Sequence, residues 1–281
     1  MRSQQELINL WKISPGELNW FIGAGGKTTT IYKIAAELNY KNTIISTTTA
    51  ILKPETIPHR VAFINSYQEL YDEVTKYSRS SYSNQQVLVL ASAQKSHPLS
   101  RFKGIKLPGL KPEWLTAIAK EFPDLNYLIE ADGSANRSIK IPADHEPVLP
   151  ESIDNLFLIQ GLSPISRAYN NIDKRIMHRA ELFNKNTKRL SFSTYKKLYS
   201  PQYWGYNRFK NSNQIRFALT QINSEILGFS KKLAKCLFNE FNHLDNFKSI
   251  TSVNYRKQPA VIYHIDREEH LYSGYNKFKR Y

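Results

Sequence analysis

The stretch LNWFIGAGGKTTTIYKIAAEL, residues 18–38, decides how the sequence is interpreted. Residues 18–22 form an apolar run that is typical of a buried strand, and the apolar residues of 31–38 recur at helical spacing on one face. A glycine-rich turn with Lys-Thr-Thr lies between them. The stretch therefore predicts a strand, a tight turn and an amphipathic helix.

Three glycines make this turn suited to an anion. Gly23, Gly25 and Gly26 permit positive φ angles and the close approach of backbone N–H groups to an oxyanion. The positive end of the following helix adds to the same site. The turn thus predicts a phosphate-binding loop, the cofactor-binding residues being Gly23, Ala24, Gly25, Gly26, Lys27, Thr28 and Thr29.

The last residues of the turn predict a nucleoside triphosphate with Mg²⁺. Lys27 would reach the β- and γ-phosphates, and the Thr28 hydroxyl would bind the metal. The common spacing G-x-x-x-x-G-K-[ST] requires a glycine at position 21, where this chain has Phe21. The shorter pattern G-x-x-G-K-T-T stands instead, with ATP or GTP and Mg²⁺ as the expected cofactors.

A phosphate loop needs an acidic partner on a neighbouring strand to hold magnesium. An apolar run at 127–129 leads into Glu130, which is the first choice, with Asp132 second. A hydroxyl cluster at 46–49 follows another predicted strand. Its Thr48 could also reach the metal or the γ-phosphate, but a helix cap or hydroxyl turn explains the cluster equally well.

The remaining chain predicts an α/β fold of three layers, like that of P-loop NTPases, with a mainly parallel sheet. Strands alternate with helical segments, a pattern that favours a parallel sheet with helices on both faces. Helices are expected after the turn, at 113–120 and around 229–241. The expected strands are 18–22, 43–45, 87–91, 127–129, 156–159, 215–219 and 261–265.

Composition excludes several protein classes. The 281 residues include one cysteine, which cannot form an internal disulfide, and they contain no apolar run long enough for a membrane span. The N-terminus lacks the apolar core of a signal peptide, so we expect a cytoplasmic protein without a membrane partner.

Charge divides the chain into two unequal halves. Residues 1–160 carry 17 Lys+Arg and 16 Asp+Glu, a net charge of +1, whereas residues 161–281 carry 22 and 8, a net charge of +14. We expect one domain over 1–281, in which 1–160 is the nucleotide-binding half and the basic half 161–281 completes the sheet. The basic half suggests phosphate-rich or acidic partners, and the more ordinary alternative is that these charges form a solvated surface.

Five segments together resemble the YqeC family, accessory proteins of selenium-dependent molybdenum hydroxylases. The segment with EADGS followed by K-x-P-A-x-H-E-P-x-x-P carries most of the resemblance, which covers roughly residues 8–185. The segments are GAGGKTT at 23–29, STTTAILKPE at 46–55, KGIKLPGLKPEWL at 103–115, LIEADGSANRSIKIPADHEPVLP at 128–150 and IMHRAELF at 176–183.

The resemblance implies an ATP- or GTP-binding P-loop protein in the maturation of a selenium-containing molybdenum cofactor. A molybdenum hydroxylase or a cofactor nucleotidyltransferase would be its partner. Near 215–219 the family shows a segment similar to the N-K-x-D guanine reader of GTPases. This chain has Asn223 where an aspartate would be needed, so ATP is favoured over GTP.

Several chemistry-capable residues lie in the matching segments. The catalytic candidates are Lys27 and Glu130 with Lys140 and Arg179, either of which could neutralise a second phosphoryl or carboxylate group during transfer. His145 with Glu146 could act as a base or bind a metal, and His178 could simply pack. A structural role, such as a loop hydrogen bond or a helix cap, is the more common outcome for each of Lys140, His145, Glu146, His178 and Arg179.

Three functions stay open from the sequence. The first is a Mg²⁺-dependent NTPase or an ATP-dependent transferase or ligase, and the second is a nucleotide-switched chaperone or insertion factor. The third and minor alternative is a nucleic-acid binder, suggested by the aromatic and basic residues of 194–211. Packing against the core explains that stretch as well, and with the phosphate loop present nucleic acid is not the favoured partner.

Overall fold

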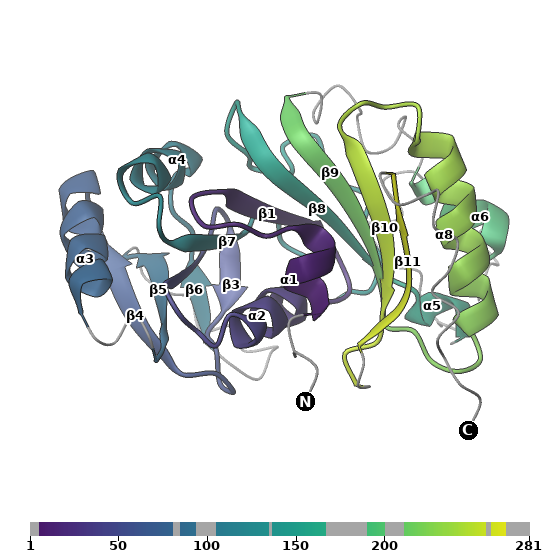
Figure 1. Cartoon of the computed structure of the whole chain (residues 1–281), viewed down its shortest axis with the longest axis horizontal. Helices are drawn as coiled ribbons and strands as arrows, with labels where there is room; N and C mark the ends of the chain where they lie inside the picture. The colour runs from purple at the N-terminus through teal and green to yellow at the C-terminus, as the bar shows by residue number, and fades with distance from the viewer. Residues whose placement is uncertain are drawn as a thin grey trace.

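The computed structural model describes residues 6–80, 85–93, 105–134, 137–166, 190–199, 211–256 and 260–267. Strands and helices alternate along most of these residues (Figure 1). The helices are α1 Glu6–Trp11, α2 Lys27–Glu37, α3 Tyr67–Arg79, α4 Pro112–Glu121, α5 Ser163–Ser166, α6 Phe192–Leu198 and α8 Leu227–Phe241. The strands are β1 Leu18–Gly23, β2 Thr43–Thr47, β3 Ala50–Leu52, β4 His59–Ile64, β5 Val87–Ser92, β6 Lys106–Pro108, β7 Asn126–Glu130, β8 Ile153–Gly161, β9 Ser212–Thr220, β10 Phe247–Val253 and β11 Val261–Asp266.

Nine of the strands form one sheet in the order β11-β10-β9-β8-β1-β7-β2-β5-β4. All neighbouring pairs are parallel except β10 and β11, which are antiparallel. Strands β3 and β6 form a separate antiparallel pair. The strands after residue 211 extend the sheet beyond β8, so that both halves of the chain contribute to it.

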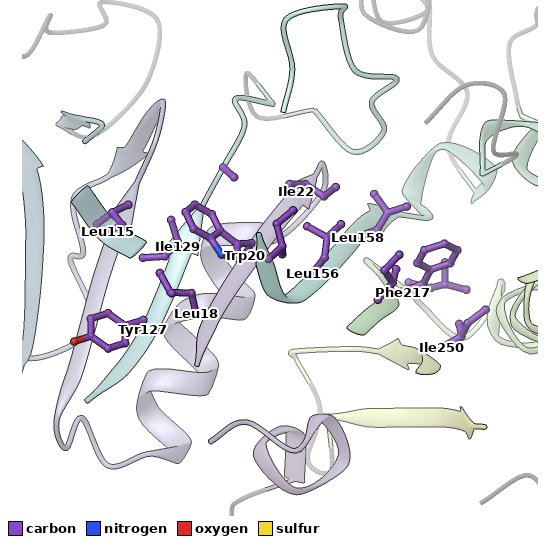
Figure 2. Close-up of a cluster of buried hydrophobic side chains, with 14 of the residues drawn as sticks. Leu18, Trp20, Ile22, Leu115, Tyr127, Ile129, Leu156, Leu158, Phe217 and Ile250 are labelled. Atoms are coloured by element: carbon purple, nitrogen blue, oxygen red, sulfur yellow. The ribbon is translucent and has the colours of Figure 1, made fainter. Parts of the chain in front are cut away.

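Helices cover both faces of the sheet, and the alternation of side chains along β1 shows how. Leu18, Trp20 and Ile22 point to one face, where they join a cluster built with α3, α4, α6 and α8. Figure 2 shows these three side chains beside neighbours from β7, β8 and α4. Phe21 points to the other face, where α1, α2 and the β3–β6 pair pack. The result is three layers with an apolar cluster on each side of the sheet.

Strand β1 lies near the middle of the sheet, and its carboxyl end is the start of the candidate site. Phe21 is in register with Glu130 on β7, and Thr47 at the end of β2 is in register with the same Glu130. Parallel strands bring their carboxyl ends to one edge, where ligands of such sheets collect. The glycine loop, defined here as residues 23–29, follows directly on this edge.

The predicted α/β class with a mainly parallel sheet is confirmed, and each predicted strand corresponds to an observed one. The structure adds elements that the sequence pattern did not reveal, namely β3, β4, β6, β10, α1, α3, α5 and α6. Strand β10 was not predicted because three of its buried residues are polar. These are Ser249, Thr251 and Ser252, all fully buried. The strands were predicted from short apolar runs, and this strand does not contain one.

Candidate functional site

The glycine loop is shaped by three positive φ angles. Gly23, Gly25 and Gly26 have φ values of 98°, 81° and 139°. A Cβ at Gly23 would lie 2.1 Å from the carbonyl oxygen of Ile159, and one at Gly25 would lie 2.4 Å from that of Ser138. Both positions therefore require glycine for conformation and for space.

Strands β8 and β9 each contact the loop through one hydrogen bond. The N–H of Ala24 donates to the carbonyl of Ile159 on β8 at 2.8 Å. The hydroxyl of Thr220, at the end of β9, donates to the carbonyl of Gly25 at 2.5 Å. Helix α2 then starts at Lys27, and its first backbone bond runs from Thr30 N to Gly26 O at 2.8 Å. The amides before Thr30 are those that a helix leaves without a partner inside itself.

Lys27 lies at the centre of a buried group of charges. Its Nζ donates to the carbonyl of Gly23 at 2.6 Å and lies 2.9 Å from Asp132 Oδ1 and 3.7 Å from Glu130 Oε1. Burial lowers the pKa of Lys27, but the two carboxylates outweigh that effect, so the net pKa is raised. Lys27 is consequently a cation at neutral pH.

Glu130 ends β7 and contacts the first turn of α2. The Thr28 hydroxyl donates to Glu130 Oε2 at 2.6 Å. Burial raises the pKa of Glu130, and the opposing effects of Lys27 and the Thr28 hydrogen bond do not cancel that rise. A second cation near this carboxylate would therefore be favourable.

Asp132 and Lys140 form the rear of the site. Asp132 is fully buried, accepts the N–H of Gly23 at 2.9 Å and lies 3.0 Å from Lys140 Nζ. Lys140 is also fully buried and lies 2.7 Å from Glu146 Oε2. The predicted residues Lys27, Thr28, Glu130, Asp132 and Lys140 are thus brought together by the fold.

The model of the YqeC family, described as the YqeC protein, matches residues 20–181 of this sequence. That range is more than half of the 281 residues and includes the glycine loop, Glu130, Asp132 and Lys140. The chain belongs to the YqeC family. Comparisons with curated proteins and with solved structures found no match.

The match to the YqeC family ends before β9, so one contact of the glycine loop lies outside the matched range. That contact is the Thr220 hydrogen bond to Gly25, which the sequence analysis missed because a threonine at a strand end has many ordinary roles. The Gly26 Cβ position, 3.4 Å from the Thr220 hydroxyl, lies on the same side. The basic half thus shapes the loop through a side chain beyond the family's matched segment.

Oxygen atoms available at the loop suit magnesium. Thr28 and Glu130 supply a hydroxyl and a carboxylate 2.6 Å apart, and Mg²⁺ is commonly held by one or two such side chains together with phosphates and water. Among the described residues, no group of three or more His, Cys, Asp or Glu side chains forms a metal cluster. The donor set therefore fits a metal that arrives with a polyphosphate better than a metal bound by protein groups alone.

The second metal candidates have other contacts. Both oxygens of Asp132 face lysines, and the Thr48 hydroxyl donates to the carbonyl of Val148 at 2.8 Å. Thr47 donates its hydroxyl to the backbone carbonyl of Glu130 at 2.7 Å. The hydroxyl cluster at the end of β2 therefore forms hydrogen bonds to the backbone of β7 and of residue 148. Ala24 and Thr29 complete the predicted loop, Ala24 buried and Thr29 exposed.

The remaining predicted residues take part in none of these contacts with the glycine loop, or they lie outside the described residues. His178 and Arg179 lie outside the described residues. His145 is exposed, and Asn223 accepts the N–H of Ile226 at 3.2 Å, just before α8. No helix in the described part of the chain is long and apolar enough to cross a membrane.

The aromatic and basic stretch 194–211 is described in part, since 200–210 lie outside the described residues. Tyr195 and Tyr199 are buried in the apolar cluster on the α8 side of the sheet. Lys196 lies 3.5 Å from Glu240 on α8. These two rings pack against the core, which was the alternative to base stacking for this stretch.

Proposed function

We propose that this protein binds a magnesium nucleoside triphosphate at the glycine loop, with ATP favoured over GTP. The observation that carries the proposal is the convergence of four features at one sheet edge. They are the glycine loop at the start of α2, the Lys27 ammonium, the Thr28 hydroxyl and the Glu130 carboxylate. Backbone amides and a lysine bind phosphate oxygens, while a hydroxyl and a carboxylate bind magnesium.

The site residues would have separate roles in phosphoryl transfer. The loop amides and Lys27 would bind the β- and γ-phosphates and offset the charge that develops on them. Thr28 and Glu130 would hold Mg²⁺, which supplies neutralisation of phosphate charge when bound. Water or an activated carboxylate or selenium species would be the acceptor, so the protein would act as an NTPase or as a transferase or ligase.

ATP is favoured because Asn223 differs from the aspartate that pairs with both N–H groups on guanine's edge. In the structure the Asn223 side chain accepts a backbone N–H at the start of the α8 region instead. This contact gives the asparagine a local role unrelated to any base. ATP and GTP should therefore be compared directly.

Membership in the YqeC family supports a biological setting for this chemistry. The setting is maturation of a selenium-containing molybdenum cofactor, with a molybdenum hydroxylase or a cofactor nucleotidyltransferase as partner. The second candidate in the same setting is a nucleotide-switched insertion factor, in which hydrolysis acts only as a timer. The two differ in whether turnover requires the partner protein.

One experiment tests the proposal. The purified protein is incubated with ATP or GTP, with Mg²⁺ or with EDTA, and retained and released nucleotides are identified by mass spectrometry. We expect retention with Mg²⁺ that EDTA weakens, and stronger retention of ATP. Absence of retention under all four conditions would refute the proposal. Product formation only when a molybdenum hydroxylase is added would favour the insertion factor.

A further inference from the structure

A buried carboxylate behind the glycine loop connects two of its functional groups. Asp132 accepts the N–H of Gly23 at 2.9 Å through Oδ2, and its Oδ1 lies 2.9 Å from Lys27 Nζ. Gly23 begins the loop and Lys27 ends its glycine-rich part, so one side chain fixes both. A displacement of Asp132 would therefore move the first amide and the lysine together.

The Lys140 ammonium has three acceptors within hydrogen-bond distance, whereas that of Lys27 has two and a third at 3.7 Å. Its Nζ lies 3.0 Å from Asp132 Oδ2 and 2.7 Å from Glu146 Oε2, and it donates to the carbonyl of Gly133 at 2.7 Å. A lysine ammonium has three N–H donors, and these three acceptors use all of them. Lys140 would have to break one of these contacts to reach a phosphate.

The backbone of Lys140 is held as firmly as its side chain. Its N–H donates to Gln160 Oε1 at 3.2 Å, and Gln160 Nε2 donates back to its carbonyl at 2.8 Å. Gln160 belongs to β8, which pairs with β1 directly before the glycine loop. The strand that neighbours β1 therefore sets the position of Lys140.

We propose that Lys140 is a positioning residue, the permanent counterion of Asp132, and acts on the loop only through that carboxylate. The proposal rests on the proposed function, in which Lys27 turns its ammonium toward a polyphosphate. When Lys27 does so, Asp132 gives up one of its two cations. Lys140 keeps the buried carboxylate paired, and Asp132 continues to hold the Gly23 amide in place.

The physical reason lies in the cost of a buried charge. Removal of one partner from a buried ion pair is strongly destabilising because the remaining charge is uncompensated, whereas removal of both charges is often close to neutral. Lys140 and Asp132 are both fully buried. Loss of the Lys140 charge leaves Asp132 with Lys27 alone and also takes away the ammonium that lies 2.7 Å from Glu146, so two carboxylates lose a cation at once. That loss should be harmful, and simultaneous loss of the Asp132 charge should relieve much of the harm because it restores the balance of charges in the group.

The test compares Lys140→Met with the double variant Lys140→Met/Asp132→Asn. Lys140→Met should lower the thermal unfolding midpoint by about 5 °C or more. It should also weaken binding of a fluorescent ATP analogue with Mg²⁺ at least about tenfold. The double variant should recover more than half of the lost midpoint and part of the affinity, because an asparagine can still accept the Gly23 N–H.

The rescue separates charge compensation from packing. If Lys140 acts only by filling space, the double variant will be at least as unstable as the single one, and that result would overturn the proposal. Lys196→Met is the matched control, since Lys196 is an exposed lysine whose ion pair with Glu240 spans 3.5 Å. Lys196→Met should change neither the thermal unfolding midpoint nor the affinity for the ATP analogue appreciably.

The midpoint measurement does not depend on nucleotide. A wild-type protein that fails to bind Mg²⁺ and ATP would refute the proposed function, while the midpoints would still decide the role of Lys140. If Lys140→Met does not fold, a folded double variant supports charge compensation. A double variant that also fails to fold overturns it.

Discussion

The Thr28 hydroxyl donates a 2.6 Å hydrogen bond to Glu130 Oε2, across 102 residues of chain. The bond joins the first turn of α2 to the carboxyl end of β7. Helix α2 follows β1 in the chain, and β1 pairs with β7 in the sheet. Thr28 belongs to the glycine loop, so the bond brings Glu130 to the part of the molecule where we propose a polyphosphate.

Glu130→Gln should bind nucleotide but lose most of its dependence on Mg²⁺. The amide is nearly the same size and can still accept the Thr28 hydroxyl, but it is a far weaker ligand for a hard cation than a carboxylate. Titration of Mg²⁺ against a fixed concentration of a fluorescent ATP analogue checks this. A normal Mg²⁺ titration in this variant would instead assign the metal to Asp132.

Lys27→Ala should stay folded and lose nucleotide affinity by at least about tenfold, which is the effect of losing one charge-assisted hydrogen bond. The fold should survive because Asp132 keeps Lys140 and the Gly23 N–H as partners. Binding of the same fluorescent analogue and a far-ultraviolet circular dichroism spectrum give the two readings. Unchanged affinity with an intact spectrum would show that Lys27 does not contact the ligand.

Gly25→Ala should destabilise the protein by more than about 1 kcal/mol and reduce nucleotide binding. Its φ is 81°, and the new Cβ would lie 2.4 Å from the Ser138 carbonyl oxygen. Gly228→Ala is the matched control in α8, where nothing lies within 4 Å of the added Cβ. It should stabilise by about 0.5–1 kcal/mol, because alanine has the higher helix propensity. Urea unfolding of both variants gives the comparison.

Stability should fall on acidification through His264 on β11. Burial lowers its pKa to about 4, and Arg216 acts in the same direction against the opposing effect of Asp266. The Thr251 hydroxyl, which accepts Trp11 Nε1 at 2.8 Å, lies 2.9 Å from His264 Nδ1. The folded state therefore favours the neutral ring, and this stability is complete above pH 6.5 and is lost as the pH falls toward 4.

The loss should reach about 3 kcal/mol, since each unit of pKa difference corresponds to about 1.4 kcal/mol. Urea unfolding at pH 7, 5.5 and 4 measures it, and His264→Gln removes this contribution while leaving other acid-sensitive groups in place. The difference between wild type and His264→Gln should therefore shrink as the pH falls. A difference that stays constant would mean that His264 does not titrate in this range.

The sequence was informative wherever a short apolar run carried a strand. Strand β1 and strand β7 are apolar and end in residues of distinctive chemistry, so the loop and Glu130 could be named in advance. Strand β4, HRVAFI, is an edge strand whose Arg60 and Phe63 are exposed, and it does not have the continuous apolar character of a central strand. Local pattern alone could not separate it from a loop.

The roles within the site were harder to predict than its location. A lysine in a polar, proline-containing segment is usually solvated, and no local feature indicates that Lys140 is fully buried. Its environment is created by Asp132, Gly133 and Glu146, which the tertiary fold assembles. The Thr220 contact is hidden for the same reason, because the residues it joins are 195 positions apart.

That separation has a consequence for synthesis on the ribosome. The carbonyl of Gly25 receives the Thr220 hydroxyl, so a nascent chain that has not yet emerged past residue 220 lacks one of the groups that shape residues 23–29. Competence to capture a ligand should therefore arise late in translation. An incomplete product that stops before β9 would carry every residue of the glycine loop without the full set of contacts that curves it.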